Sequence, residues 1–216
     1  MRLLLRRVLA RRLGSTGQSI VEFLVILPIL LIMISGLIEF GFMLNTYLDV
    51  IDAARDVARF AANVDPLETG PTVSCSTPDF YQLMRCETAI VLFVPGWTDP
   101  AYRYRYQVAL DPTRDDVVIS AFGGISSGVS ARFPDADGLS LYGWNNHVSE
   151  LSTAEINAML NPLAPNRGAV LVEVFYNYDM VLALPWITTF VPNPVTLHAY
   201  TIMPNTYIEP TSTPLP

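Results

Sequence analysis

The stretch that decides the fold is Gly17-Gln18-Ser19-Ile20-Val21-Glu22-Phe23, followed by an apolar run to Leu44 and an amphipathic segment that ends near Ala62. Residues 23–38 contain no charge, and the 22 residues from 23 to 44 contain a single charged one, Glu39. A helix rises 1.5 Å per residue, so about 20 residues cross a hydrocarbon core about 30 Å thick. The run therefore predicts a membrane-spanning helix.

Three residues are unusual in such a helix: Glu22 at its entrance, Pro28 inside it and Glu39 near its exit. A carboxylate facing lipid costs about 3 kcal/mol and usually marks a function or a partner. If the chain is cut after Gly17, the new ammonium of Gln18 lies four residues before Glu22, which is an i,i+4 spacing on one helix. The amine of a neighbouring subunit is an equal alternative. Pro28 predicts either an ordinary kink or a flexible point at which the helix leaves the bilayer.

The distribution of charged residues predicts the membrane topology and limits the classes of ligand. Residues 1–17 carry five arginines and no acid; the whole chain has 13 basic and 20 acidic residues. Removing the five leader arginines leaves eight basic residues against twenty acidic ones, a net charge of −12. A basic leader before an apolar helix predicts the N-terminus inside and the C-terminal domain outside the cytoplasmic membrane. An acidic exported domain disfavours nucleic acid as a direct ligand.

One pattern is formed by the opening stretch, by Leu27-Pro28 and by the segments 36–41 and 53–62. This pattern resembles that of TadE-like pseudopilins of tight-adherence (Flp/Tad) pilus systems. The resemblance covers residues 14–62. It implies a prepilin leader that a prepilin peptidase removes between Gly17 and Gln18. It also implies an assembly surface formed by the four residues Glu22, Phe23, Pro28 and Glu39.

By the same resemblance the protein is a non-enzymatic minor pilin in pilus assembly and surface adhesion. The implied partners are the peptidase, other pilus subunits, the inner-membrane assembly platform and membrane lipid; the protein is expected in the inner membrane or in the pilus.

Three rival interpretations remain open. A secretory signal peptide also has basic and apolar regions, although this apolar run is long and no small-x-small cleavage site ends it. A membrane-tethered binding or adhesion domain outside any filament would use the helix only as an anchor. A tethered hydrolase would need polar side chains that converge in the distal domain, although no catalytic motif is present in the sequence.

The two cysteines, Cys75 and Cys86, both follow the helix. In an oxidising compartment they fit one short-loop disulfide, with two buried thiols as the alternative. Because His147 and His198 are far away in sequence, we expect no metal site, and we expect no cofactor. Asp135-Ala136-Asp137-Gly138 resembles half of a calcium loop, but the later ligands of an EF-hand, including its terminal Glu, are missing, so we expect a solvated turn.

The fold class expected is α+β, with the long N-terminal helix packed on a distal antiparallel sheet. The four parts are a leader (1–17), a transmembrane and amphipathic helix (18–62), an extracytoplasmic sheet domain (63–203) and a Pro/Thr-rich tail (204–216). Residues 64–88 are expected to form a stapled loop, and 184–190 either an exposed apolar patch or a covered loop. The patterning predicts a short helix over 152–160 and strands over 89–94, 102–110, 117–122, 169–179 and 195–203.

Overall fold

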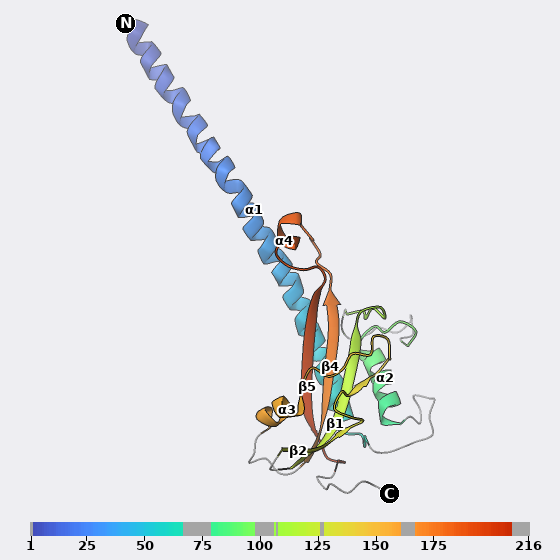
Figure 1. The fold of residues 1–216 in the computed structure, drawn as a ribbon. Coiled ribbons are helices and arrows are strands. Elements are labelled where there is room, and N and C mark those ends of the chain that lie inside the picture. The colour runs from blue at the N-terminus through green and yellow to red at the C-terminus, as the bar shows by residue number, and fades with distance from the viewer. Residues whose placement is uncertain are drawn as a thin grey trace. The chain divides into compact units, whose positions relative to one another are not determined.

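The structure is a computed structural model that describes residues 2–66, 79–97, 106, 108–125, 128–160 and 167–208. Side chains are described from Gly17 onward. Figure 1 shows the elements in chain order: α1 (Arg2–Ala61), α2 (Phe80–Val91), β1 (Asp116–Ile125), β2 (Gly128–Phe133), β3 (Leu139–Ser140), α3 (Thr153–Met159), β4 (Arg167–Tyr178), α4 (Pro185–Thr188) and β5 (Val195–Asn205).

The chain divides into two compact units. The anchor unit contains Met1–Met43 and the segment Asp179–Asn193; the sheet unit contains Leu44–Tyr178 and Pro194–Pro216. The long helix contributes to both, because α1 continues from the anchor unit into the sheet unit. Each unit is described in turn.

The sheet unit is built on an antiparallel sheet with the strand order β2-β1-β4-β5, and β3 pairs with β1 beside this path. Val117 of β1 lies opposite Val174 of β4, and Val172 of β4 lies opposite Thr201 of β5. The expected α+β class, with a long apolar helix and an antiparallel sheet, is confirmed.

The central strand β4 is apolar on both faces because both faces are covered. Val170, Val172 and Val174 belong to the main core, whereas Leu171 packs with Phe122 and Ile156 in a smaller cluster. Successive strand side chains point to opposite faces, so the even and odd positions separate into these two clusters. The prediction of a central strand here is confirmed.

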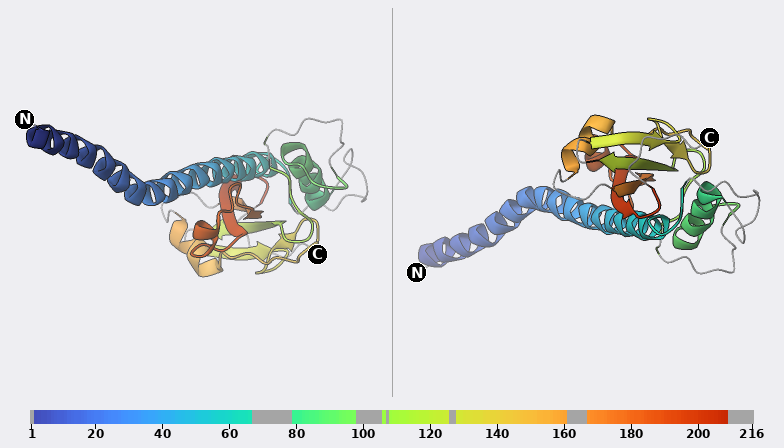
Figure 2. Two further views of the ribbon diagram at one scale, coloured as in Figure 1. Left: turned by 90° about the horizontal axis from the view of Figure 1, so that it is seen from above. Right: turned by 90° about the horizontal axis from the view of Figure 1, so that it is seen from below.

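The C-terminal part of α1 covers one face of the sheet with a strip of small side chains. Val50, Val57 and four alanines, Ala53, Ala54, Ala58 and Ala61, are at most 1% exposed and lie in the same core cluster as the β4 valines. Both views in Figure 2 show this part of the helix, in cyan, alongside the strands. Alanine has a short side chain, so the helix backbone approaches the sheet closely.

Asn205, at the end of β5, ties the sheet to the end of α1. Its Nδ2 donates to the carbonyl oxygens of Ala61 (3.0 Å) and Val64 (2.8 Å), and its Oδ1 accepts from the N–H groups of Tyr207 and Ile208. The side chain is fully buried. It satisfies a terminal carbonyl that an α-helix leaves without an internal partner.

Two local predictions were confirmed and one was wrong. Ser152 caps α3, and Glu155 completes the capping box. The strand predicted over 89–94 is wrong: residues 80–91 form α2, which begins inside the expected stapled loop. The Asp79 side chain accepts from the N–H of Gln82, and the helix buries the face that carries Phe80, Met84 and Thr88. This four-residue spacing outweighs the β-branched residues at the end of the run.

Residues 123–146, for which no strand was predicted, contain the end of β1, all of β2 and the short β3. The antiparallel pair expected between 102–110 and 117–122 is not found among the described residues. Ala109 instead forms an isolated parallel bridge with Phe93, and residues 102–105 and 107 lie outside the described range.

We predict that Asn205→Leu lowers the free energy of unfolding by about 2 kcal/mol, because the buried carbonyl and N–H groups around it lose their partners. The matched control is Asn63→Ala, which removes one exposed hydrogen bond to the Arg59 carbonyl and should change stability by less than about 0.5 kcal/mol. Guanidinium unfolding of the full chain in detergent micelles, followed by near-UV circular dichroism, measures both. Equal stability of the two variants would contradict this role of Asn205.

Candidate functional site

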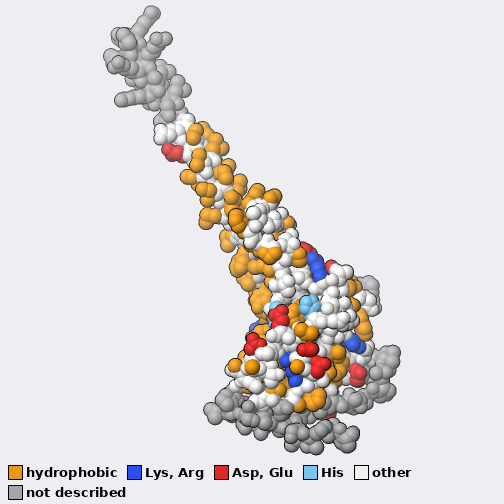
Figure 3. All heavy atoms as spheres, in the orientation of Figure 1, with side chains coloured by type: hydrophobic (Ala, Val, Ile, Leu, Met, Phe, Trp, Pro, Cys, Tyr) orange, Lys and Arg blue, Asp and Glu red, His pale blue; other side chains and the backbone are white. Residues whose placement is uncertain are grey.

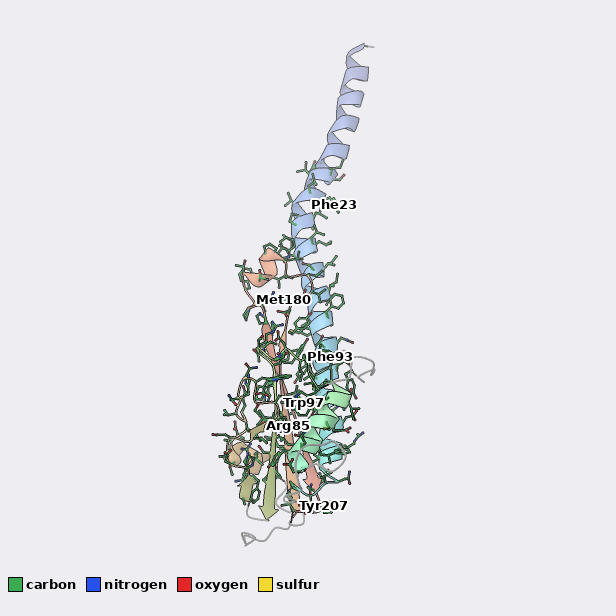
Figure 4. All side chains as sticks on the ribbon, turned by 90° about the vertical axis from the view of Figure 1, so that its right-hand side faces the viewer. Phe23, Arg85, Phe93, Trp97, Met180 and Tyr207 are labelled. Carbon is green, nitrogen blue, oxygen red and sulfur yellow. The ribbon has the colours of Figure 1, made fainter. Side chains whose placement is uncertain are left out.

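The first feature of the anchor unit is the uncovered apolar surface of α1. Most large apolar side chains from Ile20 to Leu48 are 43–72% exposed, and Phe23 is 59% exposed. Figure 3 shows hydrophobic side chains along this part of the helix, and Figure 4 labels Phe23 on it. By length and composition, the segment Gly17–Ala61 is able to cross a membrane. Such a surface requires lipid or neighbouring apolar helices to cover it.

The predicted processing site lies within a continuous helix. α1 runs from Arg2 through Gly17 and Pro28 without interruption. The side-chain amide of Gln18 donates to Glu22 Oε1 at 3.3 Å, and both side chains are exposed. The i,i+4 geometry expected between these two residues is therefore present, with the amide as the donor in the uncut chain. The roles predicted for these residues in processing and assembly stay predictions.

Glu39 has a different environment from Glu22. It is 5% exposed although it belongs to the apolar run. Its Oε1 accepts from the N–H of Val181 at 2.9 Å, and its Oε2 accepts from the N–H of Leu182 at 2.7 Å. Hydrogen bonds to an ionised acceptor are about twice as strong as neutral ones. The two N–H groups thus stabilise a carboxylate that lipid alone would not solvate.

One turn before Glu39, Ser35 makes a second contact with the same segment. Its Oγ donates to the Ile32 carbonyl at 2.9 Å and accepts from Trp186 Nε1 at 3.1 Å. Residues four apart lie on one face of a helix, so Ser35 and Glu39 form a short polar strip on α1. The segment that contacts this strip, Asp179–Asn193, connects β4 to β5 and contains α4; we call it the strap.

The strap is closed at its base and ordered internally. Asn193 Oδ1 accepts from the N–H of Met180 at 3.0 Å. α4 begins at Pro185, where a missing N–H costs nothing, and the Thr189 hydroxyl donates to the Pro185 carbonyl at 2.6 Å. The label of Met180 in Figure 4 marks the start of the strap.

The resemblance implied an assembly role for Glu39, and residues 184–190 were predicted to be either an exposed apolar patch or a covered loop. The structure combines the two descriptions: the strap bonds to α1 through backbone and indole N–H groups, while Phe190 is 86% exposed. The available signal was the four-residue spacing of Ser35 and Glu39 within an apolar helix. The spacing predicts that Ser35 and Glu39 lie on the same face of the helix, but it does not predict which segment contacts them.

In the sheet unit, the carboxylate of Glu173 is fully buried. It accepts from the Ser149 hydroxyl and from the N–H of Glu150, and it lies 3.1 Å from His198 Nε2. His198 Nδ1 lies 3.1 Å from Glu150, and Phe175 stacks on the His198 ring. Because both ring nitrogens face carboxylates and Ser149 bonds to Glu173, this cluster lacks a serine activated by histidine.

A second acidic cluster lies at the start of β1. Asp115 is 1% exposed and accepts from the N–H groups of Asp111 and Asn177. Burial raises the pKa of Asp115, although these hydrogen bonds oppose the increase. Its neighbour Asp116 accepts from the Ser140 hydroxyl and the N–H of His147. These contacts join β1 to the adjacent turns.

The remaining predictions from the sequence concern a possible calcium loop, a metal site and a disulfide. Asp135 accepts from the N–H of Asp137, and Gly138 has φ +72°, as expected for a turn. Among the residues described, no group of three or more His, Cys, Asp and Glu side chains is arranged to hold a metal ion. Cys86 is buried on α2, and Cys75 lies outside the described range, so their disulfide stays a prediction.

The comparison with protein families concerns the long helix. Residues 17–59 match the family model of TadE-like proteins. The N-terminal segment is TadE-like. The resemblance predicted from the sequence is thereby confirmed, and the match includes Gln18, Glu22, Phe23, Pro28 and Glu39. The matched region does not include the strap or the sheet. No curated protein and no solved structure matches the chain.

We predict that Glu39→Leu releases the strap from the TadE-like helix. Loss of two charge-assisted hydrogen bonds should increase amide exchange in residues 179–193 by about tenfold or more. Hydrogen–deuterium exchange with mass spectrometry on the full chain in detergent measures this rate. The matched control is Glu22→Leu, which removes an exposed carboxylate from the same helix. Unchanged exchange in the strap of Glu39→Leu would show that these bonds do not fix it.

Proposed function

We propose that this TadE-like protein is a pseudopilin or minor pilin that takes part in assembly of a tight-adherence pilus and in surface adhesion. One observation carries the proposal: the TadE-like match coincides with a helix whose apolar side chains from Ile20 to Leu37 remain uncovered in the chain. A surface of this kind suits lipid before assembly and the helices of other subunits afterwards.

The proposed topology places the N-terminus inside and the sheet unit outside the inner membrane. The five arginines of residues 1–17 support it, since positive flanking charge stays on the cytoplasmic side. A prepilin peptidase would cut between Gly17 and Gln18, so that the leader is 1–17 and the mature helix begins at Gln18. The assembly platform of the inner membrane and other pilus subunits are the proposed partners.

Glu22 is the proposed charge partner of the new N-terminus. The Gln18–Glu22 contact of 3.3 Å supports this role, because it shows that the two residues share one face of the helix. After cleavage the Gln18 ammonium adds a positive charge next to this carboxylate, or the amine of a neighbouring subunit does so. Phe23 extends the apolar packing surface, and Pro28 is the proposed flexible point in the helix.

The alternative proposal is a membrane-tethered binding or adhesion domain that does not enter a filament. Glu39 favours this alternative, because its carboxylate is bonded inside the chain to Val181 and Leu182 and does not require a subunit partner. In both proposals the protein is non-enzymatic, and the part of Glu39 is to fix the strap on the helix.

The decisive prediction concerns the N-terminus of the membrane-extracted protein. A processed pseudopilin starts at Gln18 in cells that contain the prepilin peptidase and at Met1 in cells that lack it. Intact-mass spectrometry distinguishes the two forms. A full-length chain in both samples would refute processing and leave the tethered domain.

A second prediction separates anchoring from assembly. We expect Glu22→Leu to be inserted in the membrane but to fall at least about tenfold in sheared pilus fractions, because the terminal amine loses its carboxylate. Ser19→Ala is the matched control, since it changes an exposed polar residue in the same region without removing a charge. Quantitative immunoblotting of membrane and pilus fractions gives both values. Equal incorporation of Glu22→Leu and wild type would exclude the proposed charge pairing.

A further inference from the structure

The strap presents apolar side chains to its surroundings and contains no charged residue after Asp179. Phe190 is 86% exposed, and Val181, Trp186 and Val191 are 62%, 41% and 39% exposed. In water, such a group of large apolar side chains on one short segment is unfavourable by about 25 cal/mol per Å² of apolar surface. The exposed surface therefore indicates a contact outside the chain.

Several polar groups of the strap form hydrogen bonds within the chain. The N–H groups of Val181 and Leu182 bond to Glu39, and the indole N–H of Trp186 bonds to Ser35. The hydroxyls of Thr188 and Thr189 both donate to the Pro185 carbonyl. Hydrogen bonds of this kind within the chain are what a lipid environment requires of backbone groups.

The positions of Ser35 and Glu39 along α1 indicate how deep in a membrane the strap would lie. If the hydrocarbon span begins at Ile20, helix geometry places Ser35 about 22 Å and Glu39 about 28 Å further along the axis. The hydrocarbon core is about 30 Å thick, so both residues lie near its far boundary. Tryptophan is enriched at this depth, because its ring is apolar and its N–H needs a polar partner.

From these three observations we propose that the strap is a second membrane contact, which inserts Trp186, Phe190 and Val191 into the lipid of the outer leaflet beside α1. The contact continues the exposed apolar surface of α1, and this continuity identifies lipid as its occupant. The proposal rests on the anchoring function proposed above. It adds that the membrane contact includes residues more than 140 positions after Glu39, the residue that joins them to the helix.

The test measures quenching of Trp186 fluorescence by brominated lipids. The full chain is placed in nanodiscs of phosphatidylcholine and phosphatidylglycerol whose acyl chains carry bromine either near the headgroup or near the methyl end. Subtracting the spectrum of Trp186→Phe isolates the Trp186 emission. We expect bromine near the headgroup to lower this emission about twofold or more, and bromine near the methyl end to lower it less.

Trp144 supplies the matched control. It stacks on Tyr142 with ring centroids 4.7 Å apart in the sheet unit, and subtraction of Trp144→Phe isolates its emission. Neither bromine position should quench it. Phe190→Asp provides a second variant, because this side chain is 86% exposed and its replacement leaves the bonds to Ser35 and Glu39 in place. We expect reduced quenching of Trp186 in Phe190→Asp and unchanged quenching in Phe190→Leu.

The outcomes separate the strap from the anchor. A chain that co-elutes with nanodiscs but shows no quenching of Trp186 overturns the lipid contact and leaves the membrane anchor intact. An unquenched Trp186 that becomes shielded from aqueous acrylamide as protein concentration rises also overturns it, in favour of a contact between copies of the chain. A chain that does not co-elute refutes both the anchor and the strap proposal.

Discussion

The constraint on which the structure depends is that one helix carries apolar surface along most of its length, and this surface must be covered by two different environments. Most large apolar side chains of α1 up to Leu48 are exposed in the chain, whereas from Val50 onward they are buried or packed against the core. Burial of apolar area is the main favourable term in folding, so the C-terminal part of α1 organises the sheet unit. The N-terminal part has no such cover within the described chain and is suited to a membrane.

The boundary between these environments is marked by side-chain size. Alanines dominate the buried strip, at positions 53, 54, 58 and 61, and allow close contact with β1 and β4. Leucine, isoleucine and phenylalanine dominate the exposed part, where bulk does not clash with the rest of the chain. Asn205 then fixes the end of the helix, because it bonds at once to the last turn and to the chain after β5.

The two carboxylates in the apolar part of α1 have different surroundings. Glu22 is exposed and bonds to Gln18 in the preceding turn, so it is accessible to a positive charge from elsewhere. Glu39 is buried under the strap and is bonded by two backbone N–H groups. This difference supports the separate roles proposed for the two carboxylates, Glu22 in contact between subunits and Glu39 in organisation within one chain.

The sequence by itself determined the features that depend on neighbouring residues. The length and apolarity of 23–44, the capping box of Ser152 and Glu155, and the strands β1, β4 and β5 all follow from local periodicity and caps. Residues 80–91 were the local exception, because a β-branched end obscured a helical spacing. Only the tertiary structure decided the strand order and the partner of Glu39. That partner is 142 residues away, and a contact at such separation depends on how the whole chain packs rather than on any local pattern.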